Sequence, residues 1–342
     1  MLGATGQIGR VAVRVLAEEG WDVTAASRGG GRDGDWAEGV RPVAVDRDEE
    51  GALEAALGDG CDVLVDMVAF DRRHAAQVAA LADRTGSAVV MSSGAVYEDD
   101  RGRSFDTQGE PDGFPRCPVP IPETQRTVAA GDATYGTRKV LLERELLALG
   151  DALQVTLLRA GAVHGRHSRA PRELYFVKRL LDGRRRRVLA HDGLSRFHPV
   201  HVSNVAELVR LAAARPGSRV LNAADPDAPT VAEIGAAVDE VLGLTTETVL
   251  VPGPPPEGGI GETPWSGAHP VVYDMAAAER ELGYRPVTDY VRSLPETVEW
   301  LAARLRGREW QQVFPKMART YGEALFDYAA EDAWLERYGP KQ

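Results

Sequence analysis

The chain has 342 residues, of which 44% are hydrophobic and 27% charged, and its formal net charge is −11. This length allows a large buried core divided between two lobes. The acidic balance disfavours nucleic acid as a main partner, because nucleic-acid-binding proteins present a basic face. Two cysteines provide neither a disulfide framework nor a metal-binding spacing. Because no basic-then-apolar leader and no long apolar run is present, we expect a soluble, cytoplasmic protein without membrane contact.

The first feature along the chain is a glycine-rich turn, Gly3-Ala4-Thr5-Gly6-Gln7-Ile8-Gly9. Glycines at this spacing let the backbone turn tightly, approach a pyrophosphate and pack a helix closely against a strand. The apolar stripe of residues 10–19 predicts that helix, whose N-terminus offers N–H groups and a positive dipole end to a phosphate. Residues 21–26 predict the next strand. The predicted dinucleotide contacts in this turn are Gly3, Thr5, Gly6, Gln7, Ile8 and Gly9.

The strand that should precede this turn is short. Only Met1 and Leu2 stand before Gly3, whereas a strand usually has about five residues. Two interpretations stay open: the first strand is a stub, or the natural start lies upstream of Met1.

The loop after residues 21–26 indicates which dinucleotide is bound. Folds specific for NAD usually end this strand in Asp or Glu, which accepts a hydrogen bond from the ribose 2′-hydroxyl. Here Ser27 and Arg28 take that place, and an arginine can hold a 2′-phosphate through charge-assisted hydrogen bonds. A solvated loop arginine is the alternative interpretation. We therefore expect NADP, with NAD as the alternative cofactor.

Strands and helices alternate in the next part of the chain. The predicted strands are 42–46, 62–69 and 88–91, and the predicted helices are 49–57 and 74–85. This alternation predicts an α/β fold with a parallel, doubly wound sheet that keeps its ligands at the carboxyl ends of the strands. Asp46, Val68 and Ala69 lie at such ends and are predicted cofactor contacts.

A serine, a tyrosine and a lysine then follow in an order that allows acid–base chemistry. Ser93 follows the strand at 88–91, and Tyr135 and Lys139 share one face of a predicted helix because they are four residues apart. A nearby ammonium favours the phenolate and lowers the tyrosine pKa from its usual value of about 10. Tyr135 can then exchange a proton with a substrate oxygen that Ser93 holds in place. These three residues are the candidate catalytic group.

Several motifs together resemble one enzyme family. They are Gly3-x-x-Gly6-x-x-Gly9, Ser93 four residues before Tyr97, Tyr135-x-x-x-Lys139, Leu158-Arg159-Ala160-Gly161-Ala162-Val163-His164-Gly165 and His201-Val202-Ser203-Asn204-Val205-Ala206. Over residues 1–305 the chain resembles the extended short-chain dehydrogenase/reductase family, of the NAD-dependent epimerase/dehydratase type. The resemblance implies a Rossmann sheet with a smaller mixed C-terminal lobe for the substrate. It also implies that Ala160, Ala162 and Val163 border the nicotinamide and that Lys139 bonds its ribose.

The chain departs from the family pattern at informative positions. Phe197 stands where an arginine often meets the diphosphate of a nucleotide sugar, and Arg196 is displaced by one position, which disfavours such a substrate. Relatives that dehydrate sugars have Asp and Glu directly after the catalytic Thr or Ser. Here Gly94 and Ala95 follow Ser93 and cannot transfer protons, so a 4,6-dehydratase is disfavoured.

These features predict an NADP(H)-dependent oxidoreductase acting on a carbinol or carbonyl centre of a sugar-like small molecule. Two alternatives stay open: a nucleotide-sugar 4-epimerase with tightly bound NAD, and a regulatory dinucleotide-binding protein without turnover. The expected partner is a small-molecule substrate, a sugar or a nucleotide sugar, and a homodimer is one possible assembly.

The predicted domains divide the chain at both sides of the substrate lobe. The dinucleotide-binding domain comprises 1–160 and about 200–224, the substrate lobe about 161–199 and 225–307, and an aromatic-rich helical extension 308–342. Candidate substrate contacts in the lobe are His164, Arg196 and His198, and no metal site is predicted. The basic run at 184–187 is interpreted as a solvated turn rather than an anion site.

Overall fold

The computed structural model describes residues 1–339, and the last three residues of the predicted extension lie outside them. The chain forms two compact units. Unit 1 comprises 1–163, 200–225 and 273–287, and unit 2 comprises 164–199, 226–272 and the chain from 288 onward. Residues 273–287 differ from the sequence expectation, which placed them in the smaller lobe. They return to unit 1 because α8 (Ala276–Leu282) packs against α6 (Val202–Ala214) and β9 (Arg219–Ala223).

Unit 1 is built from alternating strands and helices. In chain order these are α1 (Gln7–Glu18), β1 (Thr24–Ser27), β2 (Arg41–Ala44), α2 (Ala52–Leu57), β3 (Cys61–Asp66), α3 (Arg72–Ala80), β4 (Thr85–Ser93), α4 (Tyr135–Leu147) and β5 (Gln154–Ala160), followed by α6, β9 and α8. The chain leaves unit 1 in β6 (Ala162–His164) and returns in β8 (Pro199–His201).

The strands of unit 1 are parallel. β1 pairs with β2, and β3, β4, β5 and β9 form a four-stranded sheet in that order. Leu2 connects the two sheets, because it forms parallel bridges to Ala26 in β1 and to Asp66 in β3. The strand order is therefore β2-β1-Leu2-β3-β4-β5-β9, the order of a doubly wound dinucleotide-binding sheet. The predicted fold class is confirmed.

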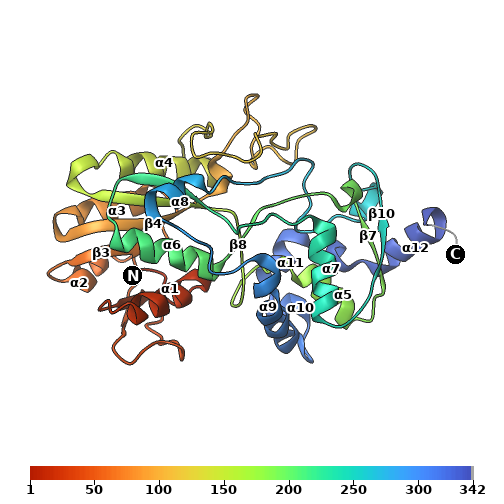
Figure 1. Cartoon of the computed structure of the whole chain (residues 1–342), viewed down its shortest axis with the longest axis horizontal. Helices are drawn as coiled ribbons and strands as arrows, with labels where there is room; N and C mark the ends of the chain where they lie inside the picture. Colours follow the sequence, from red (N-terminus) through yellow and green to blue (C-terminus); the bar gives the residue numbers. More distant parts are fainter. Residues whose placement is uncertain (340–342) are drawn as a thin grey trace. The chain divides into compact units, whose positions relative to one another are not determined.

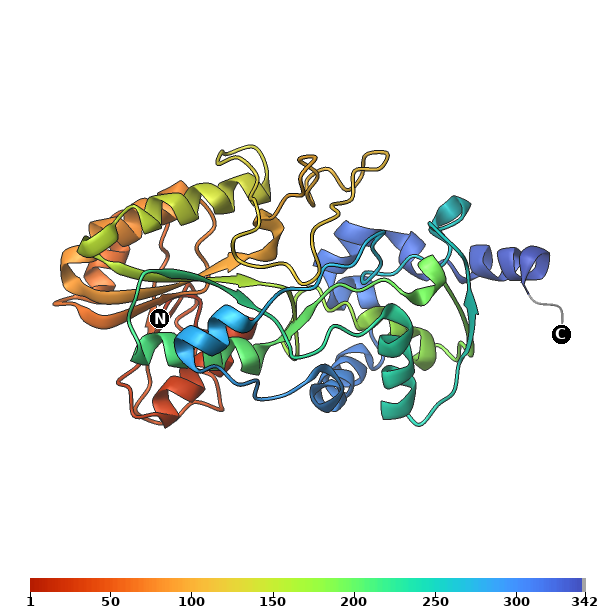
Figure 2. The same cartoon turned by 45° about the horizontal axis from the view of Figure 1, so that its top comes forward.

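Helices cover both faces of this sheet (Figures 1 and 2). In both views α3 and α4 lie on one side of the strands, and α1 and α6 lie on the other. The two core clusters follow this division. The cluster beneath α1 and α6 contains Ala12, Leu16 and Val209. The cluster beneath α3 and α4 contains Val78, Leu142 and Leu146. The strands between them are therefore buried on both faces, which explains their continuous apolar sequences.

Unit 2 is mainly helical. Its elements are α5 (Leu174–Leu181), β7 (Arg186–Leu189), α7 (Val231–Val241), β10 (Glu247–Leu250), α9 (Tyr290–Leu305), α10 (Trp310–Val313), α11 (Pro315–Tyr321) and α12 (Tyr328–Tyr338). β7 and β10 pair in parallel. The aromatic-rich segment after residue 308 is helical as expected and packs within unit 2. There the rings of Trp310 and Phe326 meet edge to face, with their centres 5.0 Å apart.

The basic run at 184–187 is not a solvated turn. It leads into β7, and three of its four arginines bind acidic side chains that are distant in sequence. Arg187 forms a buried bidentate pair with Asp239, at 3.0 and 2.9 Å. Arg184 binds Asp332 and Glu331 on α12. Composition alone predicted a turn because these partners are not local in the sequence.

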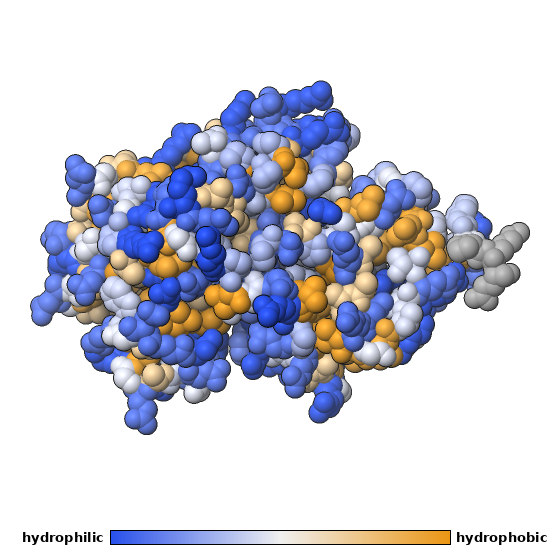
Figure 3. Space-filling model, viewed as in Figure 1, coloured by the Kyte–Doolittle hydropathy of each residue, from blue (hydrophilic) through white to orange (hydrophobic). Residues whose placement is uncertain are grey.

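The surface in Figure 3 mixes hydrophilic residues with small hydrophobic patches, as is usual for a folded domain. Within residues 1–339, no helix has both the length and the apolar character needed to cross a membrane. The same residues contain no group of three or more His, Cys, Asp or Glu side chains that could hold a metal ion.

Candidate functional site

The glycine turn has the geometry that its sequence predicts. Gly3 has a positive φ of +77°, and a Cβ there would lie 2.7 Å from Cγ1 of Val68, at the end of the neighbouring strand. A Cβ at Gly9 would collide with the carbonyl oxygen of Gly3 and lie 2.8 Å from that of Ala4. Because its N-cap is Gly6, α1 begins without a side chain over its first turn. The turn therefore leaves room for a phosphate at the helix N-terminus.

The end of β1 carries the residues predicted to select the cofactor. The Ser27 hydroxyl is buried and has no hydrogen-bond partner in residues 1–339. Arg28 is exposed, and within the same residues no ion pair or hydrogen bond engages its guanidinium. A buried hydroxyl without a partner among these residues, followed in sequence by an unengaged guanidinium, suits the hydroxyls or the 2′-phosphate of an adenosine ribose. These residues fit a dinucleotide.

Asp66 is a residue that the sequence interpretation missed. It ends β3, is fully buried, and binds Nη1 of Arg47 at 3.1 and 2.8 Å. Its carboxylate also accepts a hydrogen bond from the backbone N–H of Val68 at 2.9 Å. This pair therefore fixes the backbone at the predicted cofactor contact Val68. The carboxylate of Asp46, another predicted cofactor contact, accepts a hydrogen bond from the backbone N–H of Asp48 at 3.1 Å.

Ser93 and Tyr135 lie together at the ends of β4 and α4. Thr134 caps α4, since its hydroxyl accepts the N–H of Thr137 and bonds Asp106 at 2.5 Å. This cap places Tyr135 as the first residue of the helix. Although 41% of the residue is exposed, burial raises the pKa of Tyr135, and a hydrogen bond with the Ser93 hydroxyl acts in the opposite direction.

Lys139 lies one turn further along α4 and is 2% exposed. Its Nζ donates to the carbonyl oxygens of Ala69 at 2.5 Å and Met91 at 2.8 Å, so it connects the ends of β3 and β4. Burial lowers the pKa of Lys139 to about 8, against the opposing charge of Asp66 and Glu143. The ammonium lies 5.9 Å from the centre of the Tyr135 ring. Structure thus brings Ser93, Tyr135 and Lys139 to one place.

A buried ion pair supports α4 behind this group. Glu143, one turn after Lys139, accepts from Nε and Nη2 of Arg159 at 3.0 and 2.6 Å and from the Ser92 hydroxyl at 2.5 Å. The guanidinium of Arg159 lies 4.9 Å from the centre of the Tyr97 ring. Sequence analysis missed this pair. The spacing of four residues from Lys139 to Glu143 was the available signal, because it puts both on one helix face.

Tyr273 occupies the space beside Gly94. A Cβ at Gly94 would collide with the Tyr273 hydroxyl and lie 2.8 Å from Cε1 of its ring. Tyr273 also contacts Tyr97, with ring centres 6.0 Å apart. The residue after Ser93 is therefore restricted to glycine by packing.

The predicted nicotinamide contacts begin next to Ser93. Ala160 pairs with Ser93 on one side and with Ala223 on the other. Ala162 is buried and Val163 partly buried in β6.

The three candidate substrate contacts belong to unit 2. His164 is buried, with its ring centre 4.8 Å from that of Tyr290. His198 is buried too, and its backbone N–H donates to the carbonyl oxygen of Val271 at 2.9 Å. Arg196 is exposed. Their role toward a substrate stays a prediction.

The doubly wound parallel sheet and its glycine turn define an α/β enzyme of the dinucleotide-binding class. A sequence profile of the NAD dependent epimerase/dehydratase family matches residues 1–224, and the chain belongs to this family. The resemblance to the extended short-chain dehydrogenases/reductases is thereby confirmed. No curated protein sequence gives a significant match to the chain.

Solved structures with the same fold include sugar-nucleotide enzymes. A UDP-galactose 4-epimerase is 20% identical, with a TM-score of 0.63 over 89% of this chain and 98% of its own. A UDP-N-acetylglucosamine 4-epimerase from Methanobrevibacter ruminantium M1, in complex with UDP-N-acetylmuramic acid, is 19% identical, with a TM-score of 0.67 over 89% and 97%. A dTDP-glucose 4,6-dehydratase from Bacillus anthracis str. Ames, in complex with NAD, is 17% identical, with a TM-score of 0.64 over 89% and 96%. At these identities the similarity concerns the fold.

Proposed function

We propose that this enzyme is an oxidoreductase that interconverts a carbinol and a carbonyl centre of a sugar-like small molecule, with NADP(H) as exchangeable cosubstrate. The observation that carries this proposal is the convergence of Ser93, Tyr135 and the buried ammonium of Lys139 at the carboxyl end of β4. The carboxyl ends of the strands are where such sheets bind their ligands. A nicotinamide bound there would supply the exchange of a hydride.

Each of the three side chains has a role that follows from its surroundings. Lys139 is fixed by two backbone carbonyl oxygens, so its charge stays near the tyrosine. Burial raises the pKa of Tyr135, contrary to the sequence expectation, and the charge of a bound oxidised nicotinamide, together with Lys139, would oppose that effect. Tyr135 is partly exposed and can therefore deliver a proton to, or take one from, a substrate oxygen. Ser93 shares a hydrogen bond with the same phenol and is placed to hold that oxygen.

The preference for NADP rests on the end of β1. In the part of the chain that the structure describes, the exposed Arg28 has no ion-pair partner and the preceding Ser27 hydroxyl has no hydrogen-bond partner, at the place where folds specific for NAD usually have an acid. A charge-assisted hydrogen bond to a 2′-phosphate contributes about 1.5–3 kcal/mol. NADP should therefore bind more tightly than NAD by roughly one to two orders of magnitude.

The packing beside Ser93 supports redox chemistry over dehydration. An acid at position 94 would be needed for elimination, and the ring of Tyr273 fills that space. Net hydride exchange needs no such acid.

A nucleotide-sugar 4-epimerase is the second candidate, because structural neighbours include 4-epimerases of UDP-sugars. An epimerase of that kind would keep its dinucleotide bound throughout turnover. The two candidate functions differ in whether the purified enzyme carries bound dinucleotide and whether it consumes added dinucleotide during turnover. The proposed oxidoreductase is isolated largely without dinucleotide and changes the absorbance at 340 nm, the usual nicotinamide band, with one of a panel of sugars or ketones.

Tyr135→Phe tests the mechanism on whichever substrate is found. It should lower turnover by about 10²–10⁴, the usual contribution of one general acid or base, and leave cofactor affinity nearly unchanged. Tyr338→Phe is the matched control, because Tyr338 is 64% exposed and lies in unit 2. Bound NAD that is never released would favour the epimerase instead. Cofactor binding without any turnover across the panel would favour the regulatory protein.

A further inference from the structure

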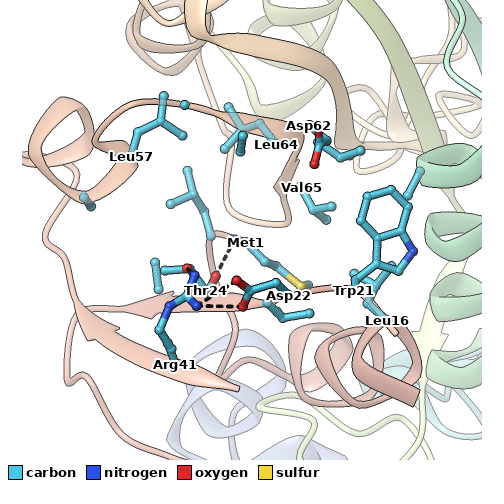
Figure 4. Close-up of a pocket in the computed structure, with 18 of the residues that line it drawn as sticks. Met1, Leu16, Trp21, Asp22, Thr24, Arg41, Leu57, Asp62, Leu64 and Val65 are labelled. Carbon is cyan, nitrogen blue, oxygen red and sulfur yellow. Dashed lines mark hydrogen bonds and ion pairs between the residues drawn. The ribbon is translucent and has the colours of Figure 1, made fainter. Parts of the chain in front are cut away.

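The two ends of β3 have different surroundings. At its start, Asp62 and Leu64 line a cavity of about 270 Å³ (Figure 4), and none of the candidate catalytic residues is among the residues that line it. At its other end, residues 67–71 connect β3 to α3 and include the predicted cofactor contacts Val68 and Ala69. We call this segment the β3–α3 connection. What fixes its backbone therefore bears on the candidate site.

One peptide group of the β3–α3 connection is held from both sides. The carbonyl oxygen of Ala69 accepts a hydrogen bond from Nζ of Lys139 at 2.5 Å. The N–H of Phe70, which belongs to the same planar peptide group, donates to Nδ1 of the buried His74 at 3.0 Å. Hydrogen bonds in series polarise one another, so the imidazole strengthens this carbonyl oxygen as an acceptor for the ammonium. His74 is thereby linked to Lys139 through a single peptide group.

His74 occupies a position that is usually a glutamate or a glutamine. It forms a capping box with Asp71 at the start of α3. The carboxylate of Asp71 accepts the backbone N–H of His74, and Nδ1 of His74 accepts the backbone N–H of Asp71, both at 3.3 Å. A Glu or Gln in this place accepts its hydrogen bond throughout the neutral pH range. An imidazole accepts only while Nδ1 carries no proton, so this cap can be lost by protonation.

The charged groups around His74 largely balance one another. They are Asp71 with Arg73 on its own helix, Asp66 with Arg47 at the end of β3, Glu145 of α4 with Arg72, and the ammonium of Lys139 on the other side of the Phe70 ring. Burial is therefore the main influence, and it lowers the pKa of His74 from its ordinary value of 6.5. A proton on Nδ1 would turn this atom from the two backbone N–H groups to the Asp71 carboxylate, 3.3 Å away.

We propose that His74 is a positioning residue for Lys139, which acts through the peptide group between Ala69 and Phe70 and only as a neutral imidazole. The proposal rests on the proposed function, in which Lys139 provides its charge beside Tyr135. The second anchor of Lys139 is the carbonyl oxygen of Met91 in β4, which makes no contact with His74 and does not titrate. Acidification therefore loosens one of the two anchors of the ammonium.

Three variants separate this role from a general loss of stability. In His74→Gln the side-chain oxygen accepts the same two N–H groups at every pH, as in an ordinary capping box. In His74→Ala no acceptor remains. His191→Gln is the matched control, because His191 lies in unit 2 and burial lowers its pKa as well. The direct measurement is the protection of the backbone N–H groups of Phe70 and Asp71 against hydrogen exchange.

Wild type and His74→Gln should protect these two N–H groups equally at pH 8. At pH 5 the protection in the wild type should fall at least about fivefold below that in His74→Gln, because an imidazole released from the cap binds a proton with a pKa of about 6.5. His74→Ala should be at least about tenfold less protected at both pH values, and His191→Gln should follow the wild type. Equal protection in the wild type and His74→Gln at both pH values would overturn the proposal, even if His74→Ala does not fold.

The effect on Lys139 is measured without substrate, so its outcome does not depend on the proposed function. The midpoint of the Lys139 titration, followed by ¹³C NMR at Cε, should lie at least about 0.5 pH lower in His74→Ala than in His74→Gln, because the lost hydrogen bond favours the charged form. Equal midpoints would overturn the link between the two residues.

Turnover is measured on whichever substrate the panel of sugars and ketones provides. From pH 8 to pH 5 the turnover of the wild type relative to His74→Gln should fall at least about threefold, together with the protection. An unchanged ratio over a range in which protection falls would overturn the positioning role. Absence of turnover in the wild type and every variant, with the expected exchange and Lys139 titration, would contradict the proposed function and support the link between His74 and Lys139.

Discussion

The ion pair between Glu143 and Arg159 provides the sharpest test of what holds α4, the helix of Tyr135 and Lys139, in place. Glu143→Gln keeps the shape of the side chain and removes its charge. The Glu143 and Arg159 side chains are 4% and 7% exposed, so water cannot replace the lost partner. Arg159 would then remain as a buried cation facing an amide.

The size of the effect follows from the contacts that are lost. The carboxylate accepts two hydrogen bonds from Arg159, at 3.0 and 2.6 Å, and one from Ser92, at 2.5 Å. Removing one member of a buried ion pair usually costs about 3–5 kcal/mol. We expect Glu143→Gln to lower the free energy of unfolding of unit 1 by this amount. In the double variant Glu143→Gln/Arg159→Met, at least about 2 kcal/mol of the loss should return, because no buried cation is left.

Urea unfolding followed by far-ultraviolet circular dichroism measures the effect. Glu18→Gln is the matched control, since it makes the same chemical change in an exposed pair with Arg14 on α1, at 3.4 Å. The free energy of unfolding of that variant should fall by no more than about 0.5 kcal/mol. The reasoning is refuted if Glu143→Gln and Glu18→Gln lose similar stability, or if the double variant Glu143→Gln/Arg159→Met is no more stable than Glu143→Gln.

Three further predictions concern the cofactor turn, the cofactor preference and Lys139. Gly9→Ala should lower the free energy of unfolding by about 1–3 kcal/mol and abolish dinucleotide binding in calorimetry, because the Cβ of the alanine would meet the backbone of Gly3 and Ala4. Gly29→Ala should change neither quantity, because a Cβ at Gly29 has no neighbouring atom within 4 Å. Arg28→Ala should weaken NADPH binding about 10–100-fold and leave NADH binding within about twofold, and tighter binding of NADH than of NADPH by the wild type would contradict the assignment. Burial lowers the pKa of Lys139 to about 8 in the folded chain, against about 10.4 in the unfolded chain. Between these two pH values the unfolded chain binds more protons than the folded one, so the free energy of unfolding increases as the pH rises. Relative to Lys139→Met, the wild type should therefore gain up to about 3 kcal/mol of stability between pH 7.5 and 10.5 in urea titrations, and a loss over this range would show that the pKa is not lowered.

The parts of the fold that the sequence predicts are those encoded locally. The glycine turn requires glycine because backbone atoms only a few residues away approach it, and the four-residue spacing of Tyr135 and Lys139 fixes a helix face. The alternation of apolar strands with amphipathic helices likewise reports on local periodicity, so the doubly wound sheet was predictable.

The parts that the sequence does not predict depend on partners far along the chain. Glu143 and Arg159 meet from a helix and a strand, and Arg184 meets Asp332 from a distance of 148 residues. No periodicity links such pairs, so a run of arginines looked like a solvated turn. The return of residues 273–287 to unit 1 has the same origin, because it depends on the packing of α8 against α6 and β9.

The buried position of Glu331 on α12 has a consequence for genetic variation in this protein. This carboxylate, 4% exposed, is the shared counter-ion of Arg179 and Arg184 in unit 2. A premature stop codon shortly before position 328 would leave every catalytic candidate in unit 1 intact. It would also remove the acid that neutralises Arg179 and uncover the core side chains Val188, Val249 and Ile260, against which Leu335 of α12 packs. Such a truncated protein would be removed by cellular proteases through the misfolding of unit 2, so the loss of a segment that contains no catalytic candidate would abolish the activity by lowering protein abundance.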